Sequence, residues 1–150
     1  ELLPVNKTNT NKGGFEESYL NKWLRDTLLP KFPKKLRKRI VNISIPSYGQ
    51  IFGHDDWYDD VLEPDDDERF PLMMSRKNRI ADYDNRAEWY WLRNATKDEY
   101  SASGFAYVSY CGHSSRNGAS YSLGVRPVFL LEYKSKPLVG GAGTKAKGEE

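Results

Sequence analysis

The sequence holds a single cysteine, Cys111, so no disulfide can form within the chain. Disulfide-stapled domains are typical of oxidising compartments, and this scarcity therefore favours folding in a reducing cytosol. No apolar run approaches the roughly 20 residues that a membrane-spanning helix needs, and we expect no membrane insertion. A strong charge of either sign is also missing: the net charge is +2, which by itself indicates no nucleic-acid partner.

The composition fits one globular domain. Of the 150 residues, 38% are hydrophobic and 13% are aromatic, which is enough for one core but hardly for two. Residues 1–13 are polar and rich in Asn and Thr, and beyond residue 133 the sequence turns to Gly, Lys and small residues. We expect a flexible segment over residues 1–13, a folded domain over residues 14–133 and a flexible tail over residues 134–150.

The spacing of the apolar residues predicts helices first and strands afterwards. Residues 19–28 have helical periodicity, and a short basic helix with Leu36 and Ile40 on one side is predicted to follow. Residues 41–45 alternate between apolar and polar, as in a strand. Further strand candidates are residues 89–92, 105–108 and 123–131. This order predicts an α+β fold.

Smaller signals lie between these elements. Ser47 precedes Gln50 by the spacing of a capping box, which predicts a short helix through Phe52. The pattern predicts a long acidic loop over residues 53–70. Three tryptophans are predicted to belong to the core, and Trp57, inside the acidic loop, is a candidate exposed aromatic residue. The three core candidates are Trp23, Trp89 and Trp91.

Residues 100–122 differ in composition from the rest of the chain. They contain seven Ser, four Tyr, three Gly and one Asn, but no Asp, Glu or Lys, whereas 29% of the whole chain is charged. Antibody loops favour Tyr, Ser, Gly and Asn because Tyr brings contact area with few rotatable bonds and the small residues make adaptable hydrogen bonds. The segment is therefore a candidate binding surface.

An ordinary loop between strands is the competing interpretation of a Ser/Gly/Asn-rich segment. The four tyrosines favour the binding surface, since plain turns do not require them. Within the segment, strand periodicity places Ala106 and Val108 on one face, and Tyr107 and Ser109 on the other. If the first pair faces the core, the second pair faces solvent.

Several short motifs share an order and spacing that match a known group of domains. The C-terminal motifs are Trp91-Leu92-Arg93, Phe105-Ala106-x-Val108, Gly112 and Gly124-Val125-Arg126-Pro127. The N-terminal motifs are Gly14, Tyr19-Leu20-x-x-Trp23-Leu24, and the segment from Pro46-Ser47 to Phe52-Gly53. Together they resemble a family of bacterial and phage domains of uncharacterised function, over roughly residues 13–131.

The resemblance implies a C-type lectin-like fold, with two N-terminal helices packed on short antiparallel strands with long loops. It also implies kinship with the variable proteins of diversity-generating retroelements, in which targeted mutagenesis rewrites ligand-contacting residues on a fixed scaffold. The variable stretch would run over residues 94–122, and its ligand-facing residue types can all be reached by substituting adenines in an Asn codon.

The resemblance also divides the residues by role. The scaffold positions that it implies are Trp91, Leu92, Arg93, Phe105, Ala106, Val108, Gly112, Gly124, Val125, Arg126 and Pro127. The ligand-binding positions that it implies are Asn94, Tyr107, Ser109, Tyr110, His113, Ser114, Ser115, Arg116, Asn117, Ser120 and Tyr121. The sugar-coordinating tripeptides Glu-Pro-Asn and Trp-Asn-Asp are missing from the chain, so calcium-dependent sugar binding is not implied with the fold.

Two charge runs have alternative interpretations. Residues 54–68 carry nine carboxylates, which could hold Ca²⁺, but they match no calcium-loop pattern and favour a solvated loop. Residues 31–39 carry six cations and no acid, without the interleaved aromatic residues that would indicate a nucleic-acid surface. Pairing between the two runs, or simple solvation, is the preferred interpretation.

Catalysis finds little support in the sequence. Cys111 and His113 could form half of a metal site, but no second pair accompanies them. Neither histidine, His54 or His113, lies in a catalytic signature, and no cofactor or metal is expected. For Arg93 and Arg126 a partly buried ion pair or backbone contact is favoured over anion binding.

The sequence thus predicts a non-catalytic ligand-binding domain for receptor binding or display, encoded by a phage or prophage. Its partner would be a protein or glycan on a cell surface, with a homo-oligomer or virion subunits as further partners, and its place a phage particle or the bacterial cell surface. The alternative is a structural decoration or tail component of a phage particle. A hydrolase of surface polysaccharide is the third hypothesis, since carboxylates are plentiful.

Overall fold

A computed structural model describes residues 1–133 of the protein, and the tail predicted over residues 134–150 lies outside the described residues. The fold is mixed α+β, as predicted, with few short helices and many short strands. The helices and helical turns are α1 (Tyr19–Trp23), η1 (Leu24–Leu28), η2 (Leu29–Lys31), α2 (Lys34–Arg37), α3 (Tyr48–Phe52), α4 (Asp56–Val61), η3 (Pro71–Met74) and α5 (Arg76–Arg79). The strands are β1 (Leu2–Leu3), β2 (Ile40–Ser44), β3 (Ala81–Tyr83), β4 (Arg86–Glu88), β5 (Tyr90–Ala95), β6 (Gly104–Val108), β7 (Ser114–Gly118), β8 (Leu123–Gly124) and β9 (Val128–Leu131).

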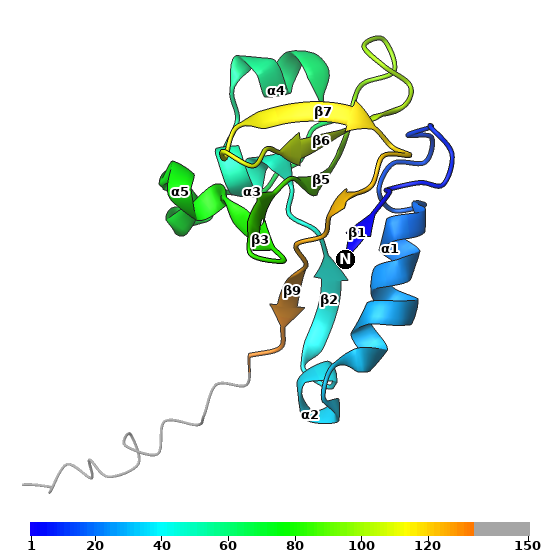
Figure 1. The fold of residues 1–150 in the computed structure, drawn as a ribbon, viewed down its shortest axis with the longest axis vertical. Coiled ribbons are helices and arrows are strands. Elements are labelled where there is room, and N and C mark those ends of the chain that lie inside the picture. Colours follow the sequence, from blue (N-terminus) through cyan, green and yellow to red (C-terminus); the bar gives the residue numbers. More distant parts are fainter. Residues whose placement is uncertain (134–150) are drawn as a thin grey trace, which may run out of the picture.

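The central sheet has the strand order β1-β8-β5-β6-β7. Strands β5 and β8 run parallel, and all other neighbours in this sheet are antiparallel. Two smaller antiparallel pairs, β2–β9 and β3–β4, complete the strands. Figure 1 shows α1 beside β1 and β2, whereas α4 lies near β7, away from α1.

Both faces of this sheet are covered. One face carries Trp91 and Phe105, which pack with residues of α1, β1 and β2 such as Leu20. The other face carries Ala106 and Val108, which are fully buried against α3 and α4. The predicted core positions of Ala106 and Val108 are thus confirmed. Because the sheet is covered on both sides, Tyr107 on the first face is half-buried rather than open to water.

The N-terminal helix forms where its periodicity predicts it. Ser18 caps α1 by accepting a hydrogen bond from the backbone N–H of Asn21, 3.1 Å away. Leu20 and Leu24, one turn apart, are fully buried. Ser47 and Gln50 form the predicted capping box at the start of α3, in which each side chain accepts a hydrogen bond from the other residue's backbone N–H.

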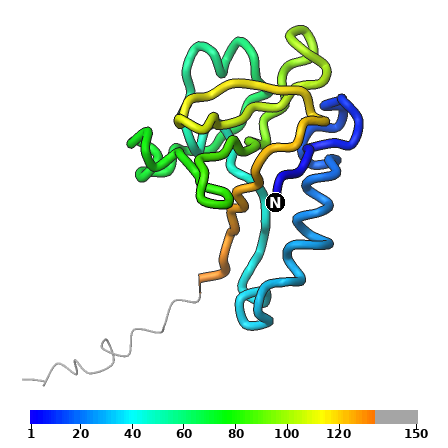
Figure 2. Tube along the Cα trace, in the orientation of Figure 1, coloured from blue at the N-terminus to red at the C-terminus, as the bar shows by residue number. Residues whose placement is uncertain are grey.

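The expected flexible segment over residues 1–13 is instead part of the fold. Strand β1 pairs with β8, and Val5 is fully buried in the main core. Figure 2 shows this blue segment running beside the part of the chain that follows β7. The buried amide of Asn11 donates to the backbone oxygens of Thr96 and Ser101, at 2.9 and 3.0 Å. The side chain of Asn11 thus bonds the segment to a loop distant in sequence, and its apolar residues tie it to the core.

The predicted acidic loop over residues 53–70 contains a helix. Asp55 caps α4 by accepting a hydrogen bond from the backbone N–H of Tyr58, 2.9 Å away. Tyr58 and Val61 are buried, while the carboxylates of the helix face solvent. An Asp at the N-cap, followed by two apolar residues three positions apart, is the pattern of a short amphipathic helix. The many carboxylates around these residues favoured the prediction of a loop instead.

The strand predicted over residues 123–131 is interrupted. It forms β8 in the central sheet and, after Pro127, β9 in the separate β2–β9 pair. Proline lacks the N–H that a ladder requires, so the chain leaves one sheet here and enters another. None of the helices in residues 1–133 is both long enough and apolar enough to cross a membrane.

Candidate binding surface

Three aromatic side chains form a row on one face of the central sheet, and this aromatic row consists of Trp89, Tyr107 and Tyr110. The indole of Trp89 lies nearly parallel to Tyr107, with ring centroids 5.3 Å apart, and to Tyr110, with centroids 6.3 Å apart. Trp89 and Tyr107 are half-buried, and Tyr110 is 57% exposed. The row therefore presents apolar ring surface and phenol hydroxyls to solvent together.

Small polar side chains of β7 lie along the row. Ser115 is directly opposite Tyr107 in the antiparallel register, and Asn117 is opposite Phe105. Asn117 accepts a hydrogen bond from the backbone N–H of Gly118, 2.8 Å away, and this bond fixes its side chain. Both β7 residues are half-buried, so this strip offers short hydroxyl and amide groups beside aromatic rings.

A tight hairpin between β6 and β7 positions Tyr110. The backbone N–H of Ser109 donates to the carbonyl oxygen of His113 at 2.7 Å, and the N–H of His113 donates to Ser109 Oγ at 3.1 Å. Gly112 has φ of +81°, and a side chain there would place its Cβ 2.8 Å from the carbonyl oxygen of Arg76. Glycine therefore lets the hairpin turn and lets it pack closely against α5.

The opposite face of β7 meets a buried aromatic cluster. Tyr48 donates its hydroxyl to Asp55 Oδ2 at 2.9 Å, and Ser114 Oγ lies 3.3 Å from the same hydroxyl. Burial of the phenol raises the pKa of Tyr48 to about 12, so it stays neutral in this cluster. Farther along β7 the guanidinium of Arg116 lies 4.4 Å from the ring centroid of Tyr100, and this cation–π contact holds the side chain over a ring.

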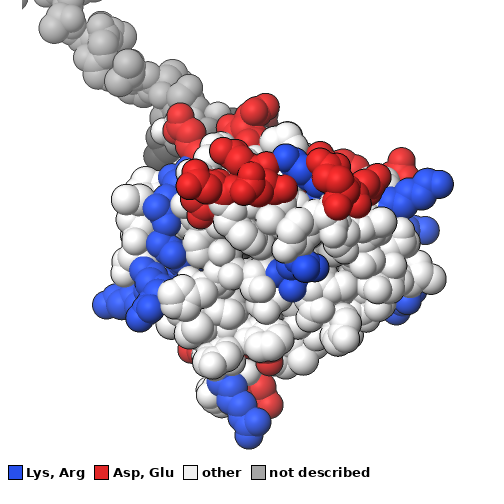
Figure 3. Space-filling view, turned by 90° about the horizontal axis from the view of Figure 1, so that it is seen from above, with Lys and Arg blue, Asp and Glu red and all other residues white. Residues whose placement is uncertain are grey.

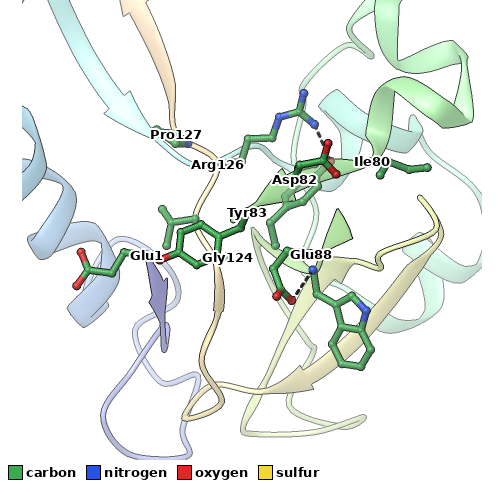
Figure 4. A pocket seen from close by; sticks show the side chains of 12 residues that line it. Glu1, Ile80, Asp82, Tyr83, Glu88, Gly124, Arg126 and Pro127 are labelled. Carbon is green, nitrogen blue, oxygen red and sulfur yellow. Dashed lines mark hydrogen bonds between the residues drawn. The ribbon is translucent and has the colours of Figure 1, made fainter. Parts of the chain in front are cut away.

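A pocket of about 410 Å³ borders the row on the other side of Trp89. Its lining includes the carboxylates of Asp82 and Glu88, the ring of Tyr83 and the guanidinium of Arg126, which Figure 4 shows around one opening. These groups come from β3, β4 and the segment after β8, which are distant in sequence. The pocket adds hydrogen-bond acceptors and one cation to the aromatic row.

The predicted ligand-binding residues differ in exposure. Tyr110 and Tyr121 are the most open tyrosines of the set, at 57% and 60%. The exposed positions are Tyr110, His113, Arg116, Ser120 and Tyr121, and the half-buried positions are Tyr107, Ser109, Ser114, Ser115 and Asn117. The structure brings Tyr107, Tyr110, Ser115 and Asn117 to the face that carries Trp89, whereas Ser114 and Arg116 point to the opposite face of β7.

Asn94 does not belong to this surface. Its side chain is 5% exposed and bonded at both ends: Oδ1 accepts from the backbone N–H of Tyr48 at 2.7 Å, and Nδ2 donates to Glu63 O at 3.0 Å and Asp65 Oδ2 at 2.7 Å. The predicted role in ligand binding is therefore wrong for Asn94. It is a structural amide, because its hydrogen bonds join β5 to α3 and to the acidic run.

Asp65 is the second part of this structural network. It accepts hydrogen bonds from the amide of Asn94, the backbone N–H groups of Gly49 and Asp67, and the hydroxyl of Ser47. Burial of the carboxylate raises the pKa of Asp65, and the four hydrogen-bond donors lower it. Together the donors have the larger effect, so the pKa of Asp65 lies below its ordinary value. The carboxylate is thus held ionised inside the fold.

The two arginines flanking the site have structural partners, as predicted. Arg93 forms an ion pair with Asp67, and its backbone N–H donates to Pro46 O at 3.0 Å. Arg126 donates to the backbone oxygen of Asn78 at 3.4 Å and to the hydroxyl of Tyr90 at 3.2 Å. Neither guanidinium is therefore free to serve mainly as an anion site.

The acidic and basic runs do not pair with each other. In residues 1–133 the close contacts between basic and acidic side chains are His54–Asp65 and Arg93–Asp67, and neither involves residues 31–39. Figure 3 shows acidic side chains gathered in a band along one edge of the face seen from above, beside a broad area with few charged side chains. The predicted pairing is therefore not found, and the basic run remains exposed to solvent.

Metal and nucleophile chemistry gains no geometric support from the described residues. Within residues 1–133 no group of three or more His, Cys, Asp or Glu is arranged to hold a metal ion. The sulfur of Cys111 lies 3.2 Å from Ser109 Oγ, and His113 Nε2 lies 3.1 Å from Arg76 Nη1. The Cys111–His113 spacing therefore serves the hairpin, with each side chain contacting a neighbour.

Trp89 is the main candidate binding residue that the sequence pattern did not identify. The apolar pattern predicts a core position for Trp89, and the structure places it at the end of the strand, half-exposed between two tyrosines. Its neighbour two positions on, Trp91, is fully buried on the same face and donates its indole N–H to Leu3 O at 2.8 Å. The available signal was that Trp89 lies at the boundary of its apolar stretch, directly after Glu88.

A family model described as a domain of unknown function (DUF6273) matches residues 2–133, which is nearly all of the described chain. No curated protein and no solved structure matches the sequence or the fold.

Proposed function

Since this chain belongs to the family described as a domain of unknown function (DUF6273), we propose a function from its own geometry: a non-catalytic domain that binds a ligand on the surface of a cell. The aromatic row beside β7 is the observation that carries this proposal. The row combines partly exposed rings, phenol hydroxyls and short polar side chains within one sheet face. Such surfaces bind by shape and hydrogen bonding, with aromatic residues as anchors.

The rigidity of the row supports binding in particular. Two stacked contacts hold Trp89, and the hydrogen-bonded hairpin holds Tyr110. A side chain that is ordered before binding loses less conformational entropy when the ligand arrives. Long charged side chains, which would lose more, are missing from the strip formed by Tyr107, Ser115 and Asn117.

For the fold we propose a C-type lectin-like arrangement, with kinship to the variable proteins of diversity-generating retroelements in a phage or prophage. Support comes from the element order, in which α1 and α2 precede every strand of the mostly antiparallel central sheet except β1, and long loops join the later strands. Further support is that the scaffold positions Phe105, Ala106 and Val108 are fully buried, whereas Tyr110 and Tyr121 are open. Gene copies from one bacterial population should then differ mainly at the exposed positions, and identical copies would contradict the kinship.

Binding can be tested on intact bacterial cells and on arrayed bacterial surface glycans. Saturable binding of the wild-type domain is expected, and Tyr110→Ala should weaken it by about tenfold or more, the loss that a binding hot spot shows. Tyr133→Ala is the matched control, because Tyr133 is 84% exposed but lies beyond β9. Failure of the wild type to bind any cell or glycan, or equal losses for both variants, would overturn the proposal.

A further inference from the structure

The β2–β9 pair presents an apolar strand with a free edge. Phe129, Leu130 and Leu131 of β9 are 39%, 62% and 40% exposed. Within residues 1–133, β2 is the one strand that pairs with β9. The free edge therefore combines unpaired backbone groups with apolar side chains.

Edge strands of soluble proteins are normally protected. Lysine, proline or a bulge on the edge prevents pairing with another chain, and an exposed apolar edge without them invites it. The bulge in this pair lies between Ile40 and Asn42, on the side of β2, and β9 itself reads Val-Phe-Leu-Leu. By contrast β7, the longer of the two edge strands of the central sheet, reads Ser-Ser-Arg-Asn-Gly and has no apolar side chain.

The β2–β9 pair forms a two-stranded ribbon whose two ends differ in charge. At its tip, residues 31–39 carry six cations, and α2 among them lies at the far end of the ribbon in Figure 1. At its base, a groove of about 320 Å³ lies over the face of β2 and β9 and reaches the acidic run. Its lining includes Asn42, Val128 and Leu130 together with Asp67, which is paired with Arg93. Asp66 and Glu68, on either side of Asp67, are exposed.

We infer that β9 pairs antiparallel with β9 of a second copy of this chain, forming a continuous four-stranded β2–β9–β9–β2 ribbon. Such a contact is isologous, with the same surface used by both copies around a two-fold axis. Antiparallel pairing sets the basic tip of each copy against the acidic base of the other, whereas parallel pairing would set the two basic tips together. Charge complementarity therefore selects both the occupant and its direction.

An anionic membrane or nucleic acid fits the β2–β9 ribbon less well than a second copy of the chain. A lipid surface or a nucleic acid could neutralise residues 31–39, but neither can continue the backbone ladder of β9. A two-stranded ribbon is marginally stable in water, and two further strands would protect it. This inference goes beyond ligand binding, since it concerns an end of the molecule away from the aromatic row.

Sedimentation velocity of the full chain tests the pairing. The wild type should sediment as a dimer at micromolar concentrations, and higher salt should weaken the dimer because its charges are exposed. Leu130→Lys should raise the dissociation constant at least about tenfold while leaving the thermal unfolding midpoint of the monomer near the wild-type value. Leu72→Lys is the control, because Leu72 is 74% exposed and lies in η3. A monomeric wild type, or a dimer that Leu130→Lys leaves intact, would overturn the inference.

A cross-linking experiment locates the interface independently. The variant Cys111→Ser with Leu130→Cys has one cysteine near the middle of β9, and mild oxidation should link two copies, because a two-fold axis through the centre of the paired β9 strands brings the two copies of residue 130 within disulfide reach. The variant Cys111→Ser with Leu72→Cys should stay unlinked. Linking through position 72 and not through position 130 would place the contact elsewhere and contradict pairing through β9.

Discussion

The indole ring of Trp89 lies against the phenol ring of Tyr107, with centroids 5.3 Å apart and 16° between the ring planes. Trp89 directly precedes β5, and Tyr107 lies in β6, the antiparallel neighbour of β5. A stacked aromatic pair contributes about 0.5–1.5 kcal/mol beyond the area that it buries. The pair therefore stabilises the end of the sheet and also holds the candidate contact surface in one shape.

The central and the exposed members of the row, Trp89 and Tyr110, should separate stability from binding. Tyr110→Ala is expected to change the free energy of unfolding by no more than about 0.5 kcal/mol, as exposed positions usually do. Trp89→Ala should cost at least about 0.5–1.5 kcal/mol, because both stacking contacts are lost. Chemical denaturation measures the two free energies, and equal costs for both variants would contradict the described packing.

Removing the side chain of Asn94 should destabilise the fold rather than change binding alone. Asn94→Ala leaves the buried N–H of Tyr48 and the oxygens of Glu63 and Asp65 without their amide partner. Each unsatisfied buried group costs about 1–3 kcal/mol. The expected loss is therefore several times that of Asn117→Ala, the control, whose side chain accepts a hydrogen bond from the backbone N–H of Gly118 and is half-buried. Denaturation curves that gave similar losses would contradict a structural role.

The network around Asp65 predicts a loss of stability in acid. Its pKa in the folded protein lies below the ordinary value of 3.8, so the ionised form is favoured by folding. The contribution of Asp65 is complete well above pH 3.8 and is lost as the pH falls through the lower, folded-state pKa. Thermal melts of the wild type and of Asp65→Asn, compared between pH 7 and pH 2, should converge at the acid end. A constant difference across this range would contradict the assignment.

Two glycines with positive φ allow the crowding at the hairpin to be measured. Gly112 and Gly14 have φ of +81° and +62°, so alanine is strained at both, by about 1–2 kcal/mol. A Cβ at Gly112 would also meet the carbonyl oxygen of Arg76 at 2.8 Å, whereas a Cβ at Gly14 meets nothing within 4 Å. Gly112→Ala should therefore lower the unfolding free energy by more than Gly14→Ala. The reverse order would show that the hairpin does not pack tightly on α5.

The sequence predicts those parts of the fold that local patterns control. The capping box of Ser47 and Gln50 depends on spacing alone, and the burial of Ala106 and Val108 depends on strand alternation. Helix α4 also has a local signal, the cap at Asp55, but the surrounding carboxylates suggest a loop when composition is weighed first.

The remaining features depend on contacts between distant segments. Asn94 has the composition of a binding residue, and only its bonds to Tyr48 and Asp65 show that it is structural. Residues 1–13 have the composition of a loose end, and pairing of β1 with β8 orders them. The exposure of Trp89 depends on where the elements packed on this face of the sheet end, and that cannot be derived from a single sequence.

Hydroxyl-radical footprinting of the domain with and without the cells or glycan that it binds tests the contact surface directly. The proposed surface predicts that bound ligand lowers the oxidation of Trp89 and Tyr110, while the oxidation of Tyr133 and Leu72 stays constant. Protection of Tyr133 or Leu72 with an unprotected aromatic row would place the ligand elsewhere on the molecule and contradict the proposed function.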